Sequence, residues 1–233
     1  MTYTIIGRCA RSRRLGLGIA TFSLGVGSYC PFIEPGRAAI STQAYVNPRL
    51  GVLAMRLLKL GFSPRRVVEE LASEDADIEY RQVGIVDGDG VVAVHSGARI
   101  RAWSGDIQRP DLVAMGNALA GPEVIEAMAD AFDAAPERDL DERLLGALEA
   151  GRDAGGQEGG DGHLDERSAV VTVYAHDPYP EIDLRVDAHE HAVDELRRVH
   201  GLYKPYLPYY RLRGYAPRET PPQEVWARDN LGG

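Results

Sequence analysis

The order of helical and strand patterns along the chain restricts its fold more than any other sequence feature. Apolar periodicity predicts one pair of helices over 50–61 and 63–71, and a second pair over 121–132 and 137–150. Strand patterns precede, separate and follow these pairs. A helix pair between strand groups needs a sheet face to cover. The order therefore predicts an α+β fold, with two antiparallel sheets between helix layers.

The strand patterns begin almost at the first residue. Residues 3–9 read as a short apolar strand, and residues 15–22 alternate large and small side chains. Because side chains on a strand point alternately to its two faces, the large residues share one face and the small ones the other. The basic turn 11–14 joins the two strands as a hairpin. Further strands are predicted at 37–45, 80–87, 91–96, 112–115, 168–175 and 182–187, and a last helix at 189–199.

Composition limits the function more than the fold. The chain has 233 residues, a hydrophobic content of 44% and a net charge of −9. The acidic balance argues against nucleic acid or an anionic membrane as partner. No apolar run approaches the ~20 residues of a membrane helix, and the first residues lack a secretory signal pattern. Two cysteines are too few for a disulfide framework, so we expect a cytoplasmic protein.

Six segments, spread over residues 1–199, resemble a bacterial family known as domain of unknown function 1028. They are residues 1–5, 15–20, 41–48, 80–87, 95–98 and 116–122. That family is similar to the N-terminal-nucleophile (Ntn) hydrolases. The resemblance implies a four-layer α/β/β/α sandwich, and it names no substrate.

The Ntn resemblance also implies a nucleophile. In those hydrolases the first residue after processing attacks an amide carbonyl, and its own α-amine serves as the base. Thr2 fits this role if Met1 is removed, because an α-amine titrates near pH ~7.7–8.0 and can activate a hydroxyl. Thr4 shares the same strand face as Thr2 and is expected to be a structural residue.

Two polar residues near the third strand are candidates for substrate binding. Proteasome-type Ntn hydrolases use Asp and Lys on their second and third strands, and this chain offers neither there. Arg37 could supply positive charge, although a solvated strand-end arginine is the simpler alternative. Gln43 could hold a substrate carbonyl or the α-amine, or could be a satisfied polar group at a strand end.

The later strands supply two further candidates. Gly116 and Asn117 end a strand before a helix, where backbone N–H groups and a side-chain amide could form an oxyanion hole. Turn chemistry alone could also explain this pair. Ser168 begins a late strand, as the bracing serine of proteasome-type members does. Asp165 precedes it, but the family usually has basic residues and Gln there, so Ser168 is the better supported of the two.

Other constellations compete with this interpretation. His189 and His191 could suggest a metal site, but on a helix residues two apart point to different sides, and we expect no metal. Cys9 and Cys30 are interpreted as packing residues rather than nucleophiles. Ser23 lacks the sequence context of a nucleophile elbow.

These observations favour an amidohydrolase that acts on a small amide without metal or cofactor. The glycine-rich segment 151–162 is expected to be a flexible loop. It carries no nucleotide-binding motif, so we do not expect a nucleotide site there. A non-catalytic scaffold that binds a small ligand or assists assembly is the alternative. The environment of Thr2 distinguishes the two hypotheses.

The chain divides into a domain at 1–200 and a C-terminal arm at 201–233. The arm carries five of the eleven tyrosines, together with Trp226, and its prolines argue against regular helix or strand. Tyr and Trp are enriched at interfaces. We therefore expect residues 201–228 to form an extended arm across the partner of a homodimer, the alternative being an arm that covers its own domain.

Overall fold

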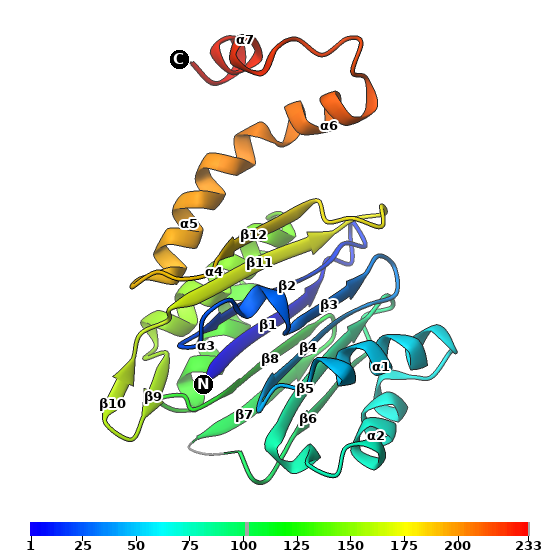
Figure 1. The fold of residues 1–233 in the computed structure, drawn as a ribbon, viewed down its shortest axis with the longest axis vertical. Helices are drawn as coiled ribbons and strands as arrows, with labels where there is room; N and C mark the ends of the chain where they lie inside the picture. The colour runs from blue at the N-terminus through cyan, green and yellow to red at the C-terminus, as the bar shows by residue number, and fades with distance from the viewer. Residues whose placement is uncertain (101–102, 233) are drawn as a thin grey trace.

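The structure of the chain is a computed structural model that describes residues 1–100 and 103–232. One sheet contains β1 (Thr2–Arg8), β2 (Leu15–Thr21), β7 (Ser104–Arg109), β8 (Leu112–Asn117), β11 (Ser168–Tyr174) and β12 (Ile182–Val186). These strands are antiparallel in the order β12-β11-β2-β1-β8-β7. The first strand of the chain therefore lies inside the sheet, between β2 and β8 (Figure 1).

A second antiparallel sheet packs against the first. It contains β3 (Pro31–Glu34), β4 (Ala38–Ala44), β5 (Arg81–Asp87) and β6 (Val92–Ser96), in the order β3-β4-β5-β6. A separate hairpin consists of β9 (Gln157–Gly159) and β10 (Gly162–Leu164). Short helical turns lie at Val26–Ser28 and Ile78–Tyr80.

Helices cover the outer face of each sheet, which confirms the α/β/β/α order expected from the sequence. The smaller sheet is covered by α1 (Pro48–Lys59) and α2 (Pro64–Glu74). The larger sheet is covered by α3 (Pro122–Asp133), α4 (Leu140–Asp153) and α5 (Ala192–Tyr203). No helix among the described residues is both long and apolar enough to cross a membrane.

The apolar core has three parts, one for each junction between layers. Ile6, Leu17 and Met115 belong to the part between the two sheets, whereas Ile5 faces α3 and α4 on the other side of β1. The even-numbered residues of β1 thus point toward the second sheet. Thr2 and Thr4 have this orientation, and with Gln43 and Gln82 they form a polar part of this mainly apolar layer.

The alternation in β2 is explained by the closeness of α4. Leu15, Leu17 and Ile19 lie in the core between the sheets, as predicted. A Cβ at Gly16 would come within 2.9 Å of Leu144 on α4, and one at Gly18 within 3.1 Å of Leu148. The small residues therefore let the helix pack directly on the strand.

Four strands were not anticipated in the sequence. β3 lies in a segment read as a Gly- and Pro-rich connection, and β7 carries the mainly polar sequence Ser-Gly-Asp-Ile-Gln-Arg at the edge of its sheet. The expected flexible loop 151–162 was wrong in part, because β9 and the start of β10 lie in it. Edge strands and short hairpins bury few side chains, so they leave little hydrophobic pattern.

The expectation of an extended C-terminal arm was also wrong. The boundary placed at 200 falls inside α5, and the chain continues as Lys204–Tyr206, α6 (Leu207–Tyr215), α7 (Gln223–Ala227) and a final turn at Arg228–Gly232. Gly233 lies outside the described residues. Pro205 and Pro208 occupy first-turn positions, where a missing N–H costs nothing, so they start helices instead of preventing them.

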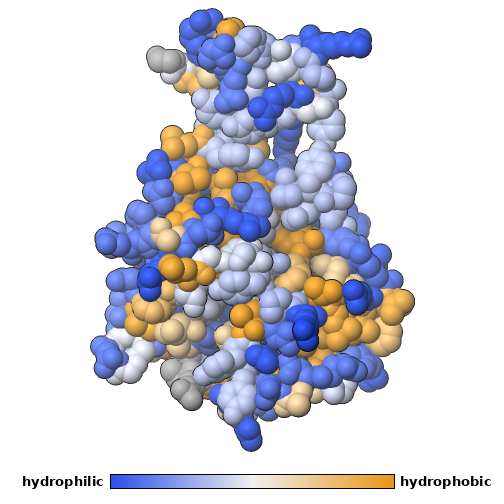
Figure 2. Space-filling model, in the orientation of Figure 1, coloured by the Kyte–Doolittle hydropathy of each residue, from blue (hydrophilic) through white to orange (hydrophobic). Residues whose placement is uncertain are grey.

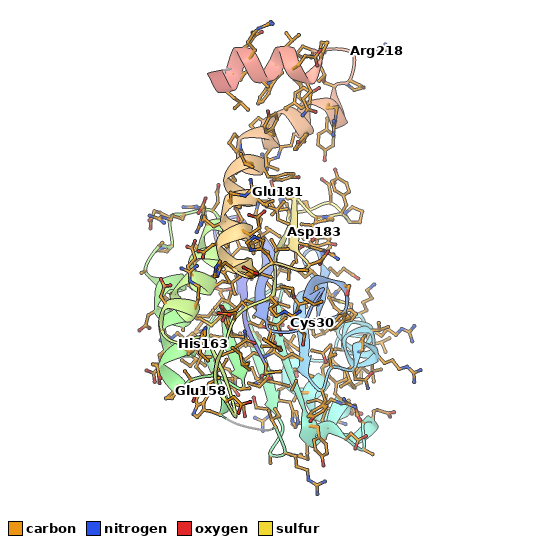
Figure 3. The ribbon with its side chains drawn as sticks, turned by 60° about the vertical axis from the view of Figure 1, so that its left-hand side comes forward. Cys30, Glu158, His163, Glu181, Asp183 and Arg218 are labelled. Atoms are coloured by element: carbon orange, nitrogen blue, oxygen red, sulfur yellow. The ribbon has the colours of Figure 1, made fainter. Side chains whose placement is uncertain are left out.

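Ion pairs attach the base of this helical arm to the domain. Glu181, next to β12, accepts hydrogen bonds from Arg14 at 2.6 and 3.1 Å and also contacts Arg211 of α6. Figure 3 shows Glu181 at the junction of arm and domain, and Arg218 at the far end of the arm. Lys204 Nζ lies 2.5 Å from the Asp141 carboxylate of α4. The arm is therefore fixed at its base and projects beyond it (Figure 1).

Asp141 connects α4 with α5 through a buried polar cluster. Its carboxylate lies 2.7 Å from His200 Nε2, and both side chains are almost completely buried. Burial by itself would raise the pKa of Asp141, but hydrogen bonds from His200 and Lys204 outweigh it, and the pKa is lowered. The ionised carboxylate is therefore favoured by folding.

Replacing Asp141 with asparagine should lower the free energy of unfolding by about 3 kcal/mol, because it removes the buried carboxylate that His200 and Lys204 both contact. Since the folded-state pKa is depressed, this stabilisation is present above the unfolded pKa of about 3.9 and is lost as pH falls below it. Urea titrations at several pH values measure both effects. Asp139→Asn, which removes an exposed partner of Lys204, is the control and should change stability by less than about 1 kcal/mol.

Candidate functional site

A row of polar side chains crosses one end of the larger sheet. Thr2 is paired in register with Thr21 of β2 and with Asn117 of β8. Thr21 is paired in turn with Ser168 of β11, and Asn117 with Ser104 of β7. Five neighbouring strands therefore each place a hydroxyl or amide residue at the same level. Because paired residues on an antiparallel sheet share a face, this row forms a polar border beside the apolar core.

The chain's α-amine is bound within this row. The nitrogen of Met1 donates to Asn117 Oδ1 at 2.7 Å. Burial lowers the pKa of this amine below its usual 8.0, because the charged form loses solvation, while the nearby Cys30 thiol acts weakly in the opposite direction. A lowered pKa increases the fraction of neutral amine at physiological pH.

The hydroxyls of Thr2 and Thr21 lie next to this amine. Their Oγ1 atoms are 3.1 Å apart, and both donate to the Met1 carbonyl oxygen. The Thr2 side chain is nearly buried, at 7% exposure, while Met1 is 39% exposed. Met1 therefore lies between the Thr2 hydroxyl and solvent.

A cavity of about 420 Å³ opens at this end of the molecule. It is lined by Met1, Ser23, Ala44, Tyr45, Ile100, Asn117, Ala118, Glu158, Gly159 and Gly160. The lining comes from both sheets and from the β9–β10 hairpin, on which Figure 3 shows Glu158 and His163. The volume suits a small molecule.

Two residues that line the cavity have strained backbones. Ala44 has φ +70° and Ala118 has φ +52°, which is left-handed geometry that residues with a Cβ rarely adopt. Each costs about 1–2 kcal/mol relative to a right-handed residue. Strain of this kind persists where surrounding structure holds it and gathers at functional sites. The two residues with strained backbones thus lie at the same end of the sheets as the polar row.

Asn117 belongs to the site, but its geometry differs from the oxyanion hole expected from the sequence. Its amide oxygen accepts from the α-amine, and its nitrogen donates to Gln82 Oε1 at 3.2 Å. Neither atom is directed at a developing negative charge. The carbonyl of Gly116 accepts from Gln82 Nε2 at 3.1 Å, so this residue also has a role in the amide network.

Gln43 lies beneath the site rather than in the cavity wall. It is 1% exposed, its oxygen accepts from Thr4 Oγ1, and its nitrogen donates to Gln82 at 2.7 Å. Both ends of its amide are used inside the protein. Arg37 lies just before β4, at the opposite end from Gln43, and it is exposed. The structure does not bring Arg37 together with the other candidates.

Ser168 braces the loop that follows β2. Its hydroxyl donates to the Ser23 carbonyl at 2.7 Å and accepts from the Val26 N–H at 3.2 Å. It is two strands from Thr2, which corresponds to about 10 Å. Ser168 therefore acts on the cavity through Ser23. Asp165 is exposed and lies 3.5 Å from His163, away from the polar row.

The competing constellations do not converge on the cavity. Burial raises the pKa of the Cys30 thiol to about 12, so little thiolate exists at neutral pH. Cys9 follows the far end of β1. Within the described part of the chain, the one group of histidine and carboxylates close enough to share a cation is Asp141, Glu142 and His200. Lys204 already places its ammonium on Asp141 there.

Gln82 is the site residue that the sequence interpretation missed. It lies on β5 with no exposed surface, and its amide contacts residues of β4, β6, β7 and β8. The sequence does contain a signal, because Gln82 is a polar residue within the apolar strand that ends at Asp87. That pattern alone does not show which partners it meets.

A family model described as a family of unknown function, DUF1028, matches residues 2–196. The chain belongs to this family. The match includes both sheets and ends within α5, so most of the helical arm lies beyond it. No curated protein matches the chain.

A solved structure from the same family agrees with the fold, and two others show a more distant likeness. Protein SPO2555 from Silicibacter pomeroyi, whose structure is assigned to the same family, is 26% identical with a TM-score of 0.79, and the match covers 87% of this chain and 86% of that one. Anbu, an ancestral β-subunit, from Yersinia bercovieri is 15% identical with a TM-score of 0.42, covering 87% and 94%. An Anbu mutant from Hyphomicrobium sp. strain MC1 is 12% identical with a TM-score of 0.41, covering 88% and 95%.

Proposed function

We propose that the protein is an Ntn-type amidohydrolase that cleaves a small amide, with Thr2 as nucleophile once Met1 is removed. The observation that carries the proposal is the arrangement at the start of β1. The Thr2 and Thr21 hydroxyls are 3.1 Å apart, and the Met1 α-amine is buried with a lowered pKa beside a cavity of about 420 Å³. Removal of Met1 would transfer the terminal amine to Thr2. An amine needs such a pKa to accept a proton near neutrality.

The other nucleophiles and bases of the chain support this assignment by their positions. The two lysines, Lys59 and Lys204, form ion pairs with Glu34 and with Asp139 and Asp141. The Cys30 thiol has a raised pKa. Of the three amines in the described residues, the chain terminus is therefore the one without an ion pair.

The proposed reaction has two steps. The Thr2 oxygen would attack the carbonyl carbon of the amide while its proton passes to the α-amine of Thr2. The C–N bond then breaks, the leaving amine takes that proton, and an ester on Thr2 remains. Water, deprotonated by the same α-amine, hydrolyses the ester and restores the hydroxyl. Thr21, whose hydroxyl is 3.1 Å from that of Thr2, would orient the nucleophile.

A scaffold without catalysis is the second candidate. The hydrogen bond from the Met1 nitrogen to Asn117 favours it, because a retained methionine would be held in place and would keep Thr2 covered. The two candidates predict different N-termini.

The mature protein should therefore lack Met1. Intact-mass measurement of protein made with normal methionine processing should give the mass of a chain that begins at Thr2. Removal of Met1 opens the cavity toward the Thr2 hydroxyl, because Met1 lines the cavity and Thr2 is nearly buried. Full retention of methionine in the native protein would contradict the nucleophile assignment and favour the scaffold.

The nucleophile can be tested without knowledge of the substrate. A small β-lactone acylates an activated hydroxyl by ring opening and leaves a mass label on that oxygen. Peptide mapping should locate the label on Thr2. Thr2→Ser should keep it, and Thr2→Ala should lose it while the fold is retained. Thr4→Ser is the matched control, because Thr4 is fully buried and bonded to Gln43. This variant protein should be labelled on Thr2, as the unaltered protein is. Labelling of Ser23 or Thr4 in the Thr2→Ala variant would assign the nucleophile elsewhere.

The arm supports a proposal about assembly, namely a homodimer formed through residues 201–232. The α7 helix packs on α6 and its neighbours, with Trp226 5.2 Å from Tyr209 between ring centres, and the arm projects from the domain (Figure 1). Its surface is mainly hydrophilic or intermediate in hydropathy on the face in Figure 2. Tyrosine-rich surfaces of this kind suit protein contacts.

Light scattering on a size-exclusion column should give a dimer mass for the full-length protein. Leu202→Glu, on the exposed side of α5 at 60% exposure, should shift it toward monomer. Leu60→Glu is the control, because Leu60 is even more exposed, at 75%, but follows α1 on the other side of the domain. A monomer mass for the full-length protein at all concentrations contradicts the assembly.

A further inference from the structure

Gln82 joins the two sheets beneath the α-amine. It projects from β5 of the smaller sheet and meets two strands of the larger one. Its nitrogen lies 3.1 Å from the carbonyl oxygens of Gly105 and Gly116 and 3.0 Å from Ser96 Oγ. Its oxygen accepts from Gln43 Nε2 at 2.7 Å and Asn117 Nδ2 at 3.2 Å.

The two backbone carbonyls determine which way this amide points. A carbonyl oxygen can only accept a hydrogen bond, so the NH₂ group of Gln82 must face Gly105 and Gly116. Its oxygen must then face Asn117. Because that oxygen can only accept, Asn117 must turn its NH₂ group toward Gln82. The oxygen of Asn117 is thereby left to face the Met1 nitrogen.

This arrangement gives the amine an acceptor without a charge. Asn117 Oδ1 accepts an amine proton, and the amide that orients it is neutral as well. A carboxylate at either position would favour the protonated amine. The titratable groups that face the amine from elsewhere are Cys30, which precedes β3, and Glu158 of β9, which lines the same cavity.

We infer that Gln82 is a positioning residue, which acts through Asn117 to present a fixed, uncharged acceptor to the α-amine of the chain. Asn117 makes this contact with the nitrogen of Met1, so the role applies to the chain that retains Met1. A catalytic meaning rests on the proposed function, in which Met1 is removed and the α-amine is that of Thr2, the register partner of Asn117. The orientation of the amides does not rest on it.

The pKa of the α-amine reports on this role without a substrate. It can be measured by competitive acetylation of full-length protein that retains Met1, across pH, followed by mass spectrometry of the N-terminal peptide. In Gln82→Met the Asn117 amide is free to turn, the ammonium loses its fixed acceptor, and the amine pKa should fall by about 0.5 or more. A role in packing alone predicts the opposite, because loosened packing admits water and raises the pKa toward 8.0.

Two variants at neighbouring positions serve as controls. Gln43→Met removes the other amide bonded to Gln82 but leaves the Gln82–Asn117 contact, so the amine pKa should stay unchanged. Gln82→Glu retains an acceptor oxygen for Asn117, and any ionised fraction of the new carboxyl adds negative charge. The pKa of the α-amine should therefore stay unchanged or rise. A fall in all three variants, or a rise in Gln82→Met, overturns the inference.

A measurement on the unaltered protein keeps the inference testable if Gln82→Met does not fold. With ¹⁵N-labelled asparagine, NMR contacts should place the Asn117 NH₂ protons near the Gln82 side chain, and these protons should exchange slowly with solvent. An Asn117 NH₂ group that faces the N-terminus instead overturns the proposed orientation. Neither result depends on whether the protein hydrolyses amides. The β-lactone experiment, which tests that activity, can therefore fail separately.

Discussion

The first strand of this protein lies in the interior of a sheet, and the charge of its α-amine must therefore be accommodated at the edge of a buried core. Desolvation of a charged group is costly unless polar partners surround it. Asn117 is the partner of the amine, and Thr2 and Thr21, at the same level on neighbouring strands, donate to the carbonyl oxygen of Met1. Much of the polar content of the inter-sheet layer, including Thr4, Gln43 and Gln82, is connected to this end of β1.

The partners are uncharged, and this choice has a physical consequence. An aspartate in place of Asn117 would stabilise the ammonium more strongly, but it would also keep the amine protonated. Amides and hydroxyls satisfy hydrogen bonds while leaving burial as the main influence on the pKa. These uncharged partners hold the terminus in the fold, and they allow a larger fraction of the amine to be neutral and able to accept a proton.

The sequence predicted those features that follow from periodicity. The alternation in β2, the helix pairs and the two-sheet architecture were all visible, because large side chains repeat wherever an element buries one face. Edge strand β7 and the arm helix α6 were missed for the same reason, since they show little of that repetition. The prolines of the arm were wrongly taken to exclude a helix there. Their position in the first turn could be recognised only from the structure.

The candidate site was predictable to a more limited degree. Thr2 and Asn117 were identified as residues, but the role of Asn117 depends on the direction of its amide, which no local pattern encodes. That direction is set by Gln82, 35 positions away in the chain, and by two backbone carbonyls on β7 and β8. Hydrogen-bond direction in a buried network is a property of all its members together. One amide whose nitrogen is fixed by backbone carbonyls is enough to orient the others, and here that amide is Gln82 rather than the residue that touches the amine.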